Sequence, residues 1–334
     1  MQLVAKSPCR VDLAGGTLDI WPLYLFHEGA VTVNFAVDRY TWCWLKPLKG
    51  RRIVLRSVDQ RLEEAFASLE ALRAARRYRL PLPAMLVRHF RPEAGLELVT
   101  KSEAPAGAGI SGSSSLMISI SAALARWSGQ RLGLERLREI AQNVEAQIIR
   151  VPTGCQDYYP AMYGGVSAIE MDAGGIRRQA MAVDQQELNR RTVLAYTGVP
   201  RNSGINNWEV TKAHIDGDRK VFRNFEQIAA IARGMRAALE AADWREAGRL
   251  LREEWAHRRR NAPGISTPLI DHLVQVTRRL GALGAKVCGA GGGGCVFFLV
   301  EPEARERVAA AIQEAGAEVL PVRVAPRGVQ VRSG

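Results

Sequence analysis

Cysteine is scarce in this sequence, and its spacing suits neither a metal site nor a disulfide framework. The chain has five cysteines, an odd number, and none stands in a C-x-x-C or Cys/His spacing. Disulfide-dependent secreted domains and structural zinc sites both need such spacings. We therefore expect reduced and mostly buried thiols at Cys9, Cys43, Cys155, Cys288 and Cys295.

Long apolar runs are also absent. No stretch of about 18 apolar residues, the length that would span a bilayer, occurs in the chain. Met1 is not followed by a secretory hydrophobic segment. We expect a cytoplasmic protein that does not bind a membrane.

Acidic residues are fewer than basic ones. The chain has 46 Lys and Arg against 34 Asp and Glu, a net charge of +12, with basic clusters at Arg73–Arg79 and His257–Arg260. Such clusters fit either a polyanionic partner or solvated helix faces. Because aromatic residues are not interleaved with these arginines and no nucleic-acid motif is visible, we do not expect nucleic-acid binding. The same charge would favour a phosphorylated small molecule.

Glycine and serine are concentrated in one stretch, Ala104–Trp127, with the sequence APAGAGISGSSSLMISISAALARW. A predicted strand at 96–100 leads into it, and the apolar run 116–124 predicts a buried helix. The loop therefore ends on a helix N-terminus, where free N–H groups and the helix dipole favour an anion. Hydroxyls that can bind phosphate oxygens or a metal are added by Ser111, Ser113, Ser114 and Ser115.

Three interpretations of this loop compete. Gly107, Gly109 and Gly112 satisfy the dinucleotide fingerprint G-x-G-x-x-G, but the acidic residue at about the right distance, Glu135, opens a predicted helix instead of ending a strand. The spacing also fits a P-loop, except that Ser113 stands where that motif has lysine. A serine-rich helix cap without a ligand is the third interpretation.

Three carboxylates are candidates for chemistry. Glu145 lies on the edge of the apolar stripe of a helix predicted over 134–148, where an unpaired charge would be costly. A metal or a buried arginine would satisfy it, and an ordinary boundary glutamate is the alternative. Asp157 follows Pro152 in a turn, and Asp19 follows a glycine turn, so each could bind a ligand or simply turn the chain.

The length of 334 residues predicts two domains. The first part is rich in strands, with a helix predicted at 61–77 and a hairpin at 166–176. Composition shifts near residue 185, after which we expect a strand at 192–197 and long helices at 221–242, 244–260 and 267–283. A glycine-rich loop, Gly289–Gly294, lies between two apolar strands and suggests a backbone close to a ligand or to the other domain.

Three segments together match a family. SPCRVDLAGGTLD, PAGAGISGSSSL and KVCGAGGGGCVFFL, in this order, resemble the three motifs of the GHMP kinases, the superfamily of galactokinase, homoserine kinase, mevalonate kinase and phosphomevalonate kinase. The resemblance spans nearly the whole chain, with Glu145 and Asp157 between the second and third motifs. In this family the glycine-serine loop is a phosphate loop without the P-loop lysine, which would explain Ser113.

The resemblance implies an α+β fold of two domains. The N-terminal domain, expected over 1–185, would resemble the second domain of ribosomal protein S5 and carry the ATP phosphate loop. The C-terminal domain, expected over 186–334, would be ferredoxin-like. The active site would lie in the cleft between them.

The family pattern also assigns residues. ATP phosphates would bind at Gly107, Ala108, Gly109, Ser111, Gly112, Ser113, Ser114 and Ser115, although Gly112 departs from a position that is often serine. Ser113 and Glu145 would hold Mg²⁺. Asp157 would be the general base toward the acceptor hydroxyl, with Arg10 beside it to keep it ionised. The acceptor would be bound by Gly16, Thr17, Asp19, Gly291, Gly292 and Gly293.

Within the family, RVDLAGGTLDIWPLY and the segment WAHRRR before PGIS resemble the heptose-phosphate kinase and fucokinase branch. The resemblance implies an ATP- and Mg²⁺-dependent kinase of the anomeric hydroxyl of a sugar or sugar phosphate, with those small molecules as its partners and room for a homodimer. One alternative is a kinase of a non-sugar alcohol such as mevalonate or phosphomevalonate. A catalytically silent nucleotide-binding or nucleic-acid-binding relative is another, although the presence together of Arg10, Ser113, Glu145 and Asp157 argues against it.

Overall fold

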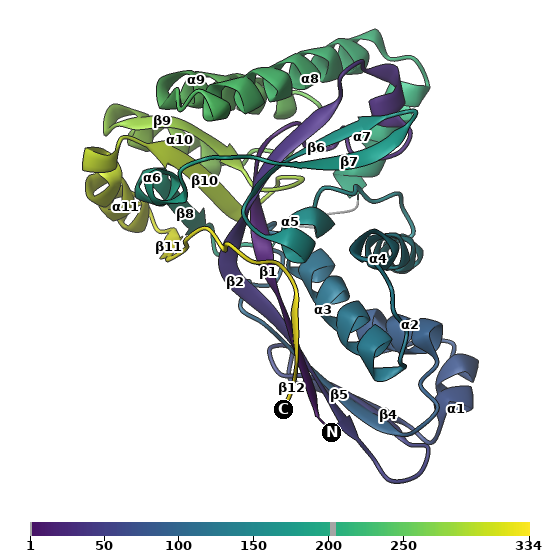
Figure 1. Ribbon diagram of the computed structural model, residues 1–334. Coiled ribbons are helices and arrows are strands. Elements are labelled where there is room, and N and C mark those ends of the chain that lie inside the picture. The colour runs from purple at the N-terminus through teal and green to yellow at the C-terminus, as the bar shows by residue number, and fades with distance from the viewer. Residues whose placement is uncertain (1, 201–204) are drawn as a thin grey trace.

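The computed structural model describes residues 2–200 and 205–334, which fold around two β-sheets (Figure 1). Strands β1 (Leu3–Ala14) and β2 (Val31–Pro47) pair side by side through the middle of the molecule. The end of β1 and the start of β2 are buried on both faces, whereas the remainder alternates between buried and half-exposed residues. The part that is buried on both faces is mostly apolar but contains a few charged groups. These charged groups lie at the candidate active site described below.

The first sheet has eight strands in the order β12-β1-β2-β5-β3-β4, with β6 pairing β2 and β7. Only β3 and β5 are parallel, and the other pairs are antiparallel. The remaining strands are β3 (Ile53–Ser57), β4 (Leu62–Phe66), β5 (Leu96–Ser102), β6 (Val166–Asp172), β7 (Gly175–Ala180) and β12 (Gln330–Ser333).

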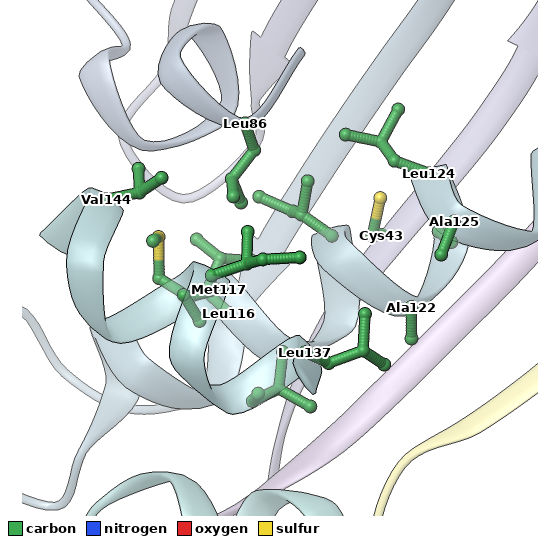
Figure 2. Close-up of a cluster of buried hydrophobic side chains, with 14 of the residues drawn as sticks. Cys43, Leu86, Leu116, Met117, Ala122, Leu124, Ala125, Leu137 and Val144 are labelled. Carbon is green, nitrogen blue, oxygen red and sulfur yellow. The ribbon is translucent and has the colours of Figure 1, made fainter. Parts of the chain in front are cut away.

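Helices cover one face of this sheet. The central helix α3 (Gly112–Trp127) lies against β1 and β2, and twelve of its residues are buried. Figure 2 shows Met117 of α3 among apolar side chains that include Leu86 of α2 and Val144 of α4. Burial of such side chains, at about 25 cal/mol per Å², stabilises the packing of α3 against its neighbours. The surrounding helices are α1 (Leu69–Ala74), α2 (Pro81–Phe90), α4 (Leu134–Ile149) and α5 (Tyr158–Tyr163).

The second sheet has four strands in the order β11-β8-β10-β9. They are β8 (Thr192–Tyr196), β9 (Ala282–Val287), β10 (Cys295–Val300) and β11 (Glu318–Leu320). The helices of this half are α6 (Gln185–Arg191), α7 (Ile205–Ile215), α8 (Arg219–Glu240), α9 (Trp244–Arg258), α10 (Pro268–Arg279) and α11 (Arg305–Glu314). Short 3-10 turns occur at η1 (Leu23–Phe26) and η2 (Pro302–Ala304). Both α8 and α9 contact strands of the first sheet as well.

The two halves are joined at more than one place. The chain passes from the first sheet to the second between β7 and β8, but β12 returns to pair with β1, so the two termini lie close together (Figure 1). Val324 also bridges to Val37 of β2. The α+β architecture is thus confirmed, and the division at residue 185 stays a prediction.

Two predicted helices differ from the structure. Residues 61–77 form β4 and the short α1 instead of one helix, because Arg61 turns the chain in the left-handed region and the segment Leu62–Phe66 then alternates between half-buried and exposed positions. The helix expected at 267–283 ends at Arg279, since Gly281 has a φ of +104° and the chain continues into β9.

Two further predictions concern the state of the cysteines and the absence of a membrane span. All five cysteines are buried, and none forms a disulfide with another described residue, which confirms the prediction. Among the described residues, no helix combines the length and the apolar character that crossing a bilayer requires.

Candidate active site

A cavity of about 520 Å³ opens where loops of the two halves meet. It is lined by β1 and its glycine turn, the loop before α3, the segment from the end of α4 to α5, the last turn of α9 and the start of the loop after β9. Segments more than 200 residues apart in the sequence, such as Arg10 and Arg258, thereby share one wall. The motifs identified in the sequence converge on this cavity.

The glycine-serine loop forms one side of the cavity. Gly107 and Gly109 have φ values of +66° and +78°, which glycine adopts without a steric penalty, and Ser111 has a φ of 62°. Helix α3 then begins at Gly112 without a side-chain cap, so N–H groups of its first turn are available to an anion. The hydroxyl of Ser111 is buried and has no hydrogen-bond partner in the described part of the chain. The loop therefore presents donors suited to phosphate oxygens.

Glu145 lies beneath this loop, on α4. Its carboxylate accepts hydrogen bonds from the Ser113 hydroxyl at 2.8 Å, from the Ser114 hydroxyl at 3.2 Å, and from Tyr158. Burial raises the pKa of Glu145, although the three hydroxyls act in the opposite direction. No Lys, Arg or His among the described residues forms an ion pair with it. A cation bound at the loop would offset the buried negative charge of Glu145.

The donors at Glu145 fit Mg²⁺. Mg²⁺ prefers hard oxygen ligands and commonly takes one or two carboxylates together with substrate phosphates and water. The described residues contain no cluster of three or more His, Cys, Asp or Glu that could hold a metal ion. Ser113 and Glu145 would therefore supply only part of the coordination, with phosphate oxygens and water completing it.

Asp157 and Arg10 form an ion pair next to the glycine-serine loop. Nε and Nη2 of Arg10 both donate to Oδ1 of Asp157, at 2.8 and 2.6 Å, and Nη1 donates to the carbonyl of Gly109 at 2.7 Å. Burial alone would lower the pKa of Arg10, but Asp157 and Asp12 raise it above its usual value. No hydrogen bond of Oδ2 is found among the described residues, and Asp157 is 28% exposed. One carboxylate oxygen thus faces the cavity, while the other is fixed to the arginine.

Asp19 lies near this pair but is more deeply buried. Its carboxylate accepts hydrogen bonds from the backbone N–H of Gln156 at 2.9 Å and from the Gln156 amide at 3.4 Å. Gly154 makes the approach possible, since a Cβ there would lie 2.0 Å from Oδ2 of Asp19. Burial, followed by the negative charge of Asp157, raises the pKa of Asp19 to about 6. An ionised Asp19 is therefore costly to the free protein and would be relieved by hydrogen-bond donors on a ligand.

We expect Asp19→Asn to stabilise the ligand-free protein at alkaline pH. A pKa raised from 3.8 to about 6 on folding means that the folded state binds the proton more tightly, so stability is lost as pH rises through about 6. Removing the charge should therefore raise the free energy of unfolding by ~1–3 kcal/mol at pH 8 and by little at pH 4. Denaturant unfolding at both values measures this.

Asp172→Asn provides the matched control for that experiment. Asp172 is exposed and pairs with Arg177, so neutralising it should not stabilise the protein at either pH. A stability of Asp19→Asn equal to that of the wild type at pH 8 would contradict the burial argument.

The structure brings most of the predicted site residues to the cavity. Arg10, Gly16, Thr17, Asp19, Glu145 and Asp157 line it, as do Gly107, Ala108, Gly109, Ser111, Gly112, Ser113 and Ser114. Ser115 points away, toward the Ser7 carbonyl and Thr41. Gly291, Gly292 and Gly293 are not among the lining residues, and their places on this loop are taken by Gly289 and Ala290.

Sequence reasoning missed a set of buried charged groups at the back of the cavity. Asp12, Glu254, Arg258 and Lys286 are connected there by ion pairs. Arg258 belonged to a basic cluster that also fits a solvated face, yet it points inward and lines the cavity. The available signal was Asp12, a carboxylate between Val11 and Leu13 in a buried stretch of strand, two positions from Arg10.

Comparison with known families matches both parts of the chain. Residues 71–165 match the GHMP kinases N terminal domain, and residues 235–318 match the GHMP kinases C terminal model. Together the two matches cover more than half of the 334 residues. The predicted resemblance is confirmed.

Individual proteins give a similar picture. The chain is 26% identical over 320 residues to D-glycero-alpha-D-manno-heptose 7-phosphate kinase of Campylobacter jejuni, with 92% of each chain covered. It is 25% identical over 337 residues to L-fucokinase/L-fucose-1-P guanylyltransferase of Bacteroides fragilis, covering 91% of this chain and 35% of that protein. Among solved structures, a D-glycero-D-manno-heptose 1-phosphate kinase from Bacteroides thetaiotaomicron superposes with a TM-score of 0.79 at 22% identity, with 99% of each chain covered.

Proposed function

Because the chain belongs to the GHMP kinases, we propose that it transfers the terminal phosphoryl group of ATP to a hydroxyl of a sugar or sugar phosphate. The observation that carries this proposal is the placement of Arg10. Its guanidinium bonds both to Asp157 and to the Gly109 carbonyl of the glycine-serine loop, so a carboxylate base and a phosphate loop are held in one unit. The similarity to heptose-phosphate kinase and fucokinase sequences supports the sugar class.

In this proposal each group has a role that its contacts suit. The loop N–H groups and the Ser111 hydroxyl bind and orient the ATP phosphates. Oδ2 of Asp157, which Arg10 leaves unoccupied, accepts the proton of the attacking hydroxyl, while Oδ1 stays fixed. Arg10 holds Asp157 in position and offsets negative charge that develops on the transferred group.

Magnesium would supply charge neutralisation on the phosphates when bound, and Ser113 and Glu145 are the residues that would hold it. The Ser113 hydroxyl and the carboxylate lie 2.8 Å apart, so both can face one ion. Tyr158 and Ser114 fix the orientation of the carboxylate from the protein side.

The charges of the cavity favour a sugar over a mevalonate-like acid. Among the described lining residues, the cations are Arg10 and Arg258, and both are already paired with carboxylates. A carboxylic acid bound against Asp19 would need a free arginine there and would be repelled by Asp19 and Asp157, whereas the phosphate of a sugar phosphate would be distal to the reacting hydroxyl. A pair of sugar hydroxyls, in contrast, can donate to the buried carboxylate of Asp19. We propose the anomeric hydroxyl as the position phosphorylated, on the resemblance of the first motif to the heptose and fucose kinase branch.

A panel assay tests the proposal. ADP release should be seen with at least one hexose, heptose or heptose phosphate and not with mevalonate, and ³¹P NMR of the product should show an anomeric phosphate. In Asp19→Ala we expect acceptor affinity to be lost while ATP affinity is kept, because the side-chain hydrogen bonds found for Asp19 among the described residues come from Gln156 and none comes from the glycine-serine loop. Phosphate on a primary alcohol, or turnover of mevalonate with no sugar accepted, would reject the sugar proposal and leave a kinase of another alcohol.

A further inference from the structure

A continuous chain of buried ion pairs runs behind the cavity from one half of the molecule to the other. Arg10 bonds to Asp157 and lies 3.4 Å from Asp12. The other oxygen of Asp12 is 2.6 Å from Nζ of Lys286, on β9. Lys286 is also 2.9 Å from Glu254, on α9. Finally, Glu254 is 2.7 Å from Arg258.

Both ends of this chain reach groups that line the cavity. Arg258 donates to the carbonyl of Gly16 at 2.7 Å and to the Thr17 hydroxyl at 3.3 Å, in the turn that leads to Asp19. Asp12 also accepts the backbone N–H of Gly289 at 3.1 Å. The chain therefore connects the proposed base, the acceptor turn and the start of the glycine loop.

Arg10 lies within ion-pair distance of two carboxylates, Asp12 and Asp157, and in the proposed reaction it must pair with Asp157. Asp157 needs the arginine as its cation, whereas Asp12 is fully buried beside it. Burial alone would raise the pKa of Asp12, but Lys286, Arg10 and Arg258 hold it well below its usual value. Coulomb attraction rises as the charges approach and is strong where water is excluded, so an uncompensated Asp12 would compete for Arg10.

We propose that Lys286 is a positioning residue that neutralises Asp12 and thereby leaves Arg10 to support Asp157. This inference rests on the proposed function, in which Asp157 is the base. Lys286 is fully buried, and its ammonium group is shared between Asp12 and Glu254. It acts on the reacting groups only through Asp12 and Arg10.

The arrangement of partners allows the competition to be tested by suppression. In Lys286→Met, Glu254 keeps Arg258, so Asp12 loses its nearest cation, and Arg10, 3.4 Å away, is its remaining ion-pair partner among the described residues. In the double variant Asp12→Asn/Lys286→Met, no competing carboxylate remains, and the amide oxygen introduced at position 12 can still accept from Gly289. Asp12→Asn should therefore restore the activity that Lys286→Met loses.

We expect Lys286→Met to lower kcat by about 10-fold or more with little change in KM for ATP, and the double variant to recover most of that loss. Crystal structures of the variants provide a second readout that does not depend on knowing the acceptor. In Lys286→Met the Arg10 guanidinium should shift from Asp157 toward Asp12, and in the double variant it should return. Val296→Ala, in a fully buried position on β10, controls for loss of stability without loss of a charge.

Several outcomes would overturn the inference. The first is a kcat per folded Lys286→Met molecule equal to that of Val296→Ala. The second is a crystal structure of Lys286→Met in which Arg10 stays on Asp157. The third is a folded double variant whose kcat is as low as that of Lys286→Met. If Lys286→Met does not fold, Asp12→Asn and the double variant carry the test, since both should retain Arg10 on Asp157. A wild type without turnover on any acceptor would instead reject the proposed function, and the crystal structures would still decide the role of Lys286.

Discussion

Asp157→Asn should bind ATP normally and lose about 100-fold or more of its kcat. The substitution keeps the shape of the side chain and can still accept at Oδ1 from Arg10, but it removes the charge that takes the hydroxyl proton. Arg10 then loses the charge of its main ionic partner, but its hydrogen bond to the Gly109 carbonyl remains, and Lys286 still pairs with Asp12. Single-turnover rates with saturating ATP and acceptor would measure the chemical step, and titration with ATP would measure binding.

The control for this variant is Asp216→Asn, which makes the same change in an exposed ion pair with Lys212 on α7. Its kcat should equal that of the wild type. An unchanged rate in Asp157→Asn would show that Asp157 only shapes the turn before α5. A loss of ATP binding in parallel with kcat would instead assign Asp157 to the nucleotide side of the cavity.

Local patterns were sufficient to predict the glycine-serine loop, the helix after it and the burial of the carboxylate beneath it. Glycines mark where the backbone has positive φ, and the apolar run marks α3, so the loop and helix follow from the sequence. The position of Glu145 on the edge of a helical stripe indicated burial, and the structure places it beneath the loop. These features depend on residues near one another in the chain.

The orientations of the consecutive serines 113–115 can be predicted from helical geometry. Successive helical residues point about 100° apart, so neighbouring hydroxyls cannot all face the same ligand. Ser113 and Ser114 face Glu145, whereas Ser115 faces the Ser7 carbonyl under the sheet. Helical geometry alone therefore argues against a phosphate contact from all three positions.

The buried ion pairs could not be predicted from the sequence. Asp12 and Lys286 are 274 positions apart, and strand periodicity tells which face a side chain takes but not which strand of another sheet lies opposite. Arg258 and Arg259 are adjacent in one basic cluster, yet the first is buried against Glu254 and the second is about half exposed. The difference in their burial comes from the packing of α9 against β9 and β1.

Glu145→Gln should lower turnover by several orders of magnitude while the protein stays folded. The glutamine side chain keeps the volume, and the hydroxyls of Ser113, Ser114 and Tyr158 can each rotate to accept as well as donate, so the amide can be satisfied. The change removes the negative charge of Glu145, which lies beneath the glycine-serine loop. Among the described residues, no basic side chain pairs with this charge. Glu139→Gln, a half-exposed position on the same helix, is the matched control.

The binding measurement separates a metal ligand from a structural glutamate. In the wild type, Mg²⁺ should strengthen ATP binding and ATP should strengthen Mg²⁺ binding by the same factor, because the two are linked. In Glu145→Gln this mutual strengthening should fall by about tenfold or more, with ATP binding in the absence of metal little changed or improved, since a carboxylate close to the phosphates repels them. Calorimetric titration of ATP at several Mg²⁺ concentrations measures both effects. Turnover within a few-fold of wild type, or undiminished coupling between Mg²⁺ and ATP, would show that Glu145 only anchors Tyr158 and the serines at the start of α3.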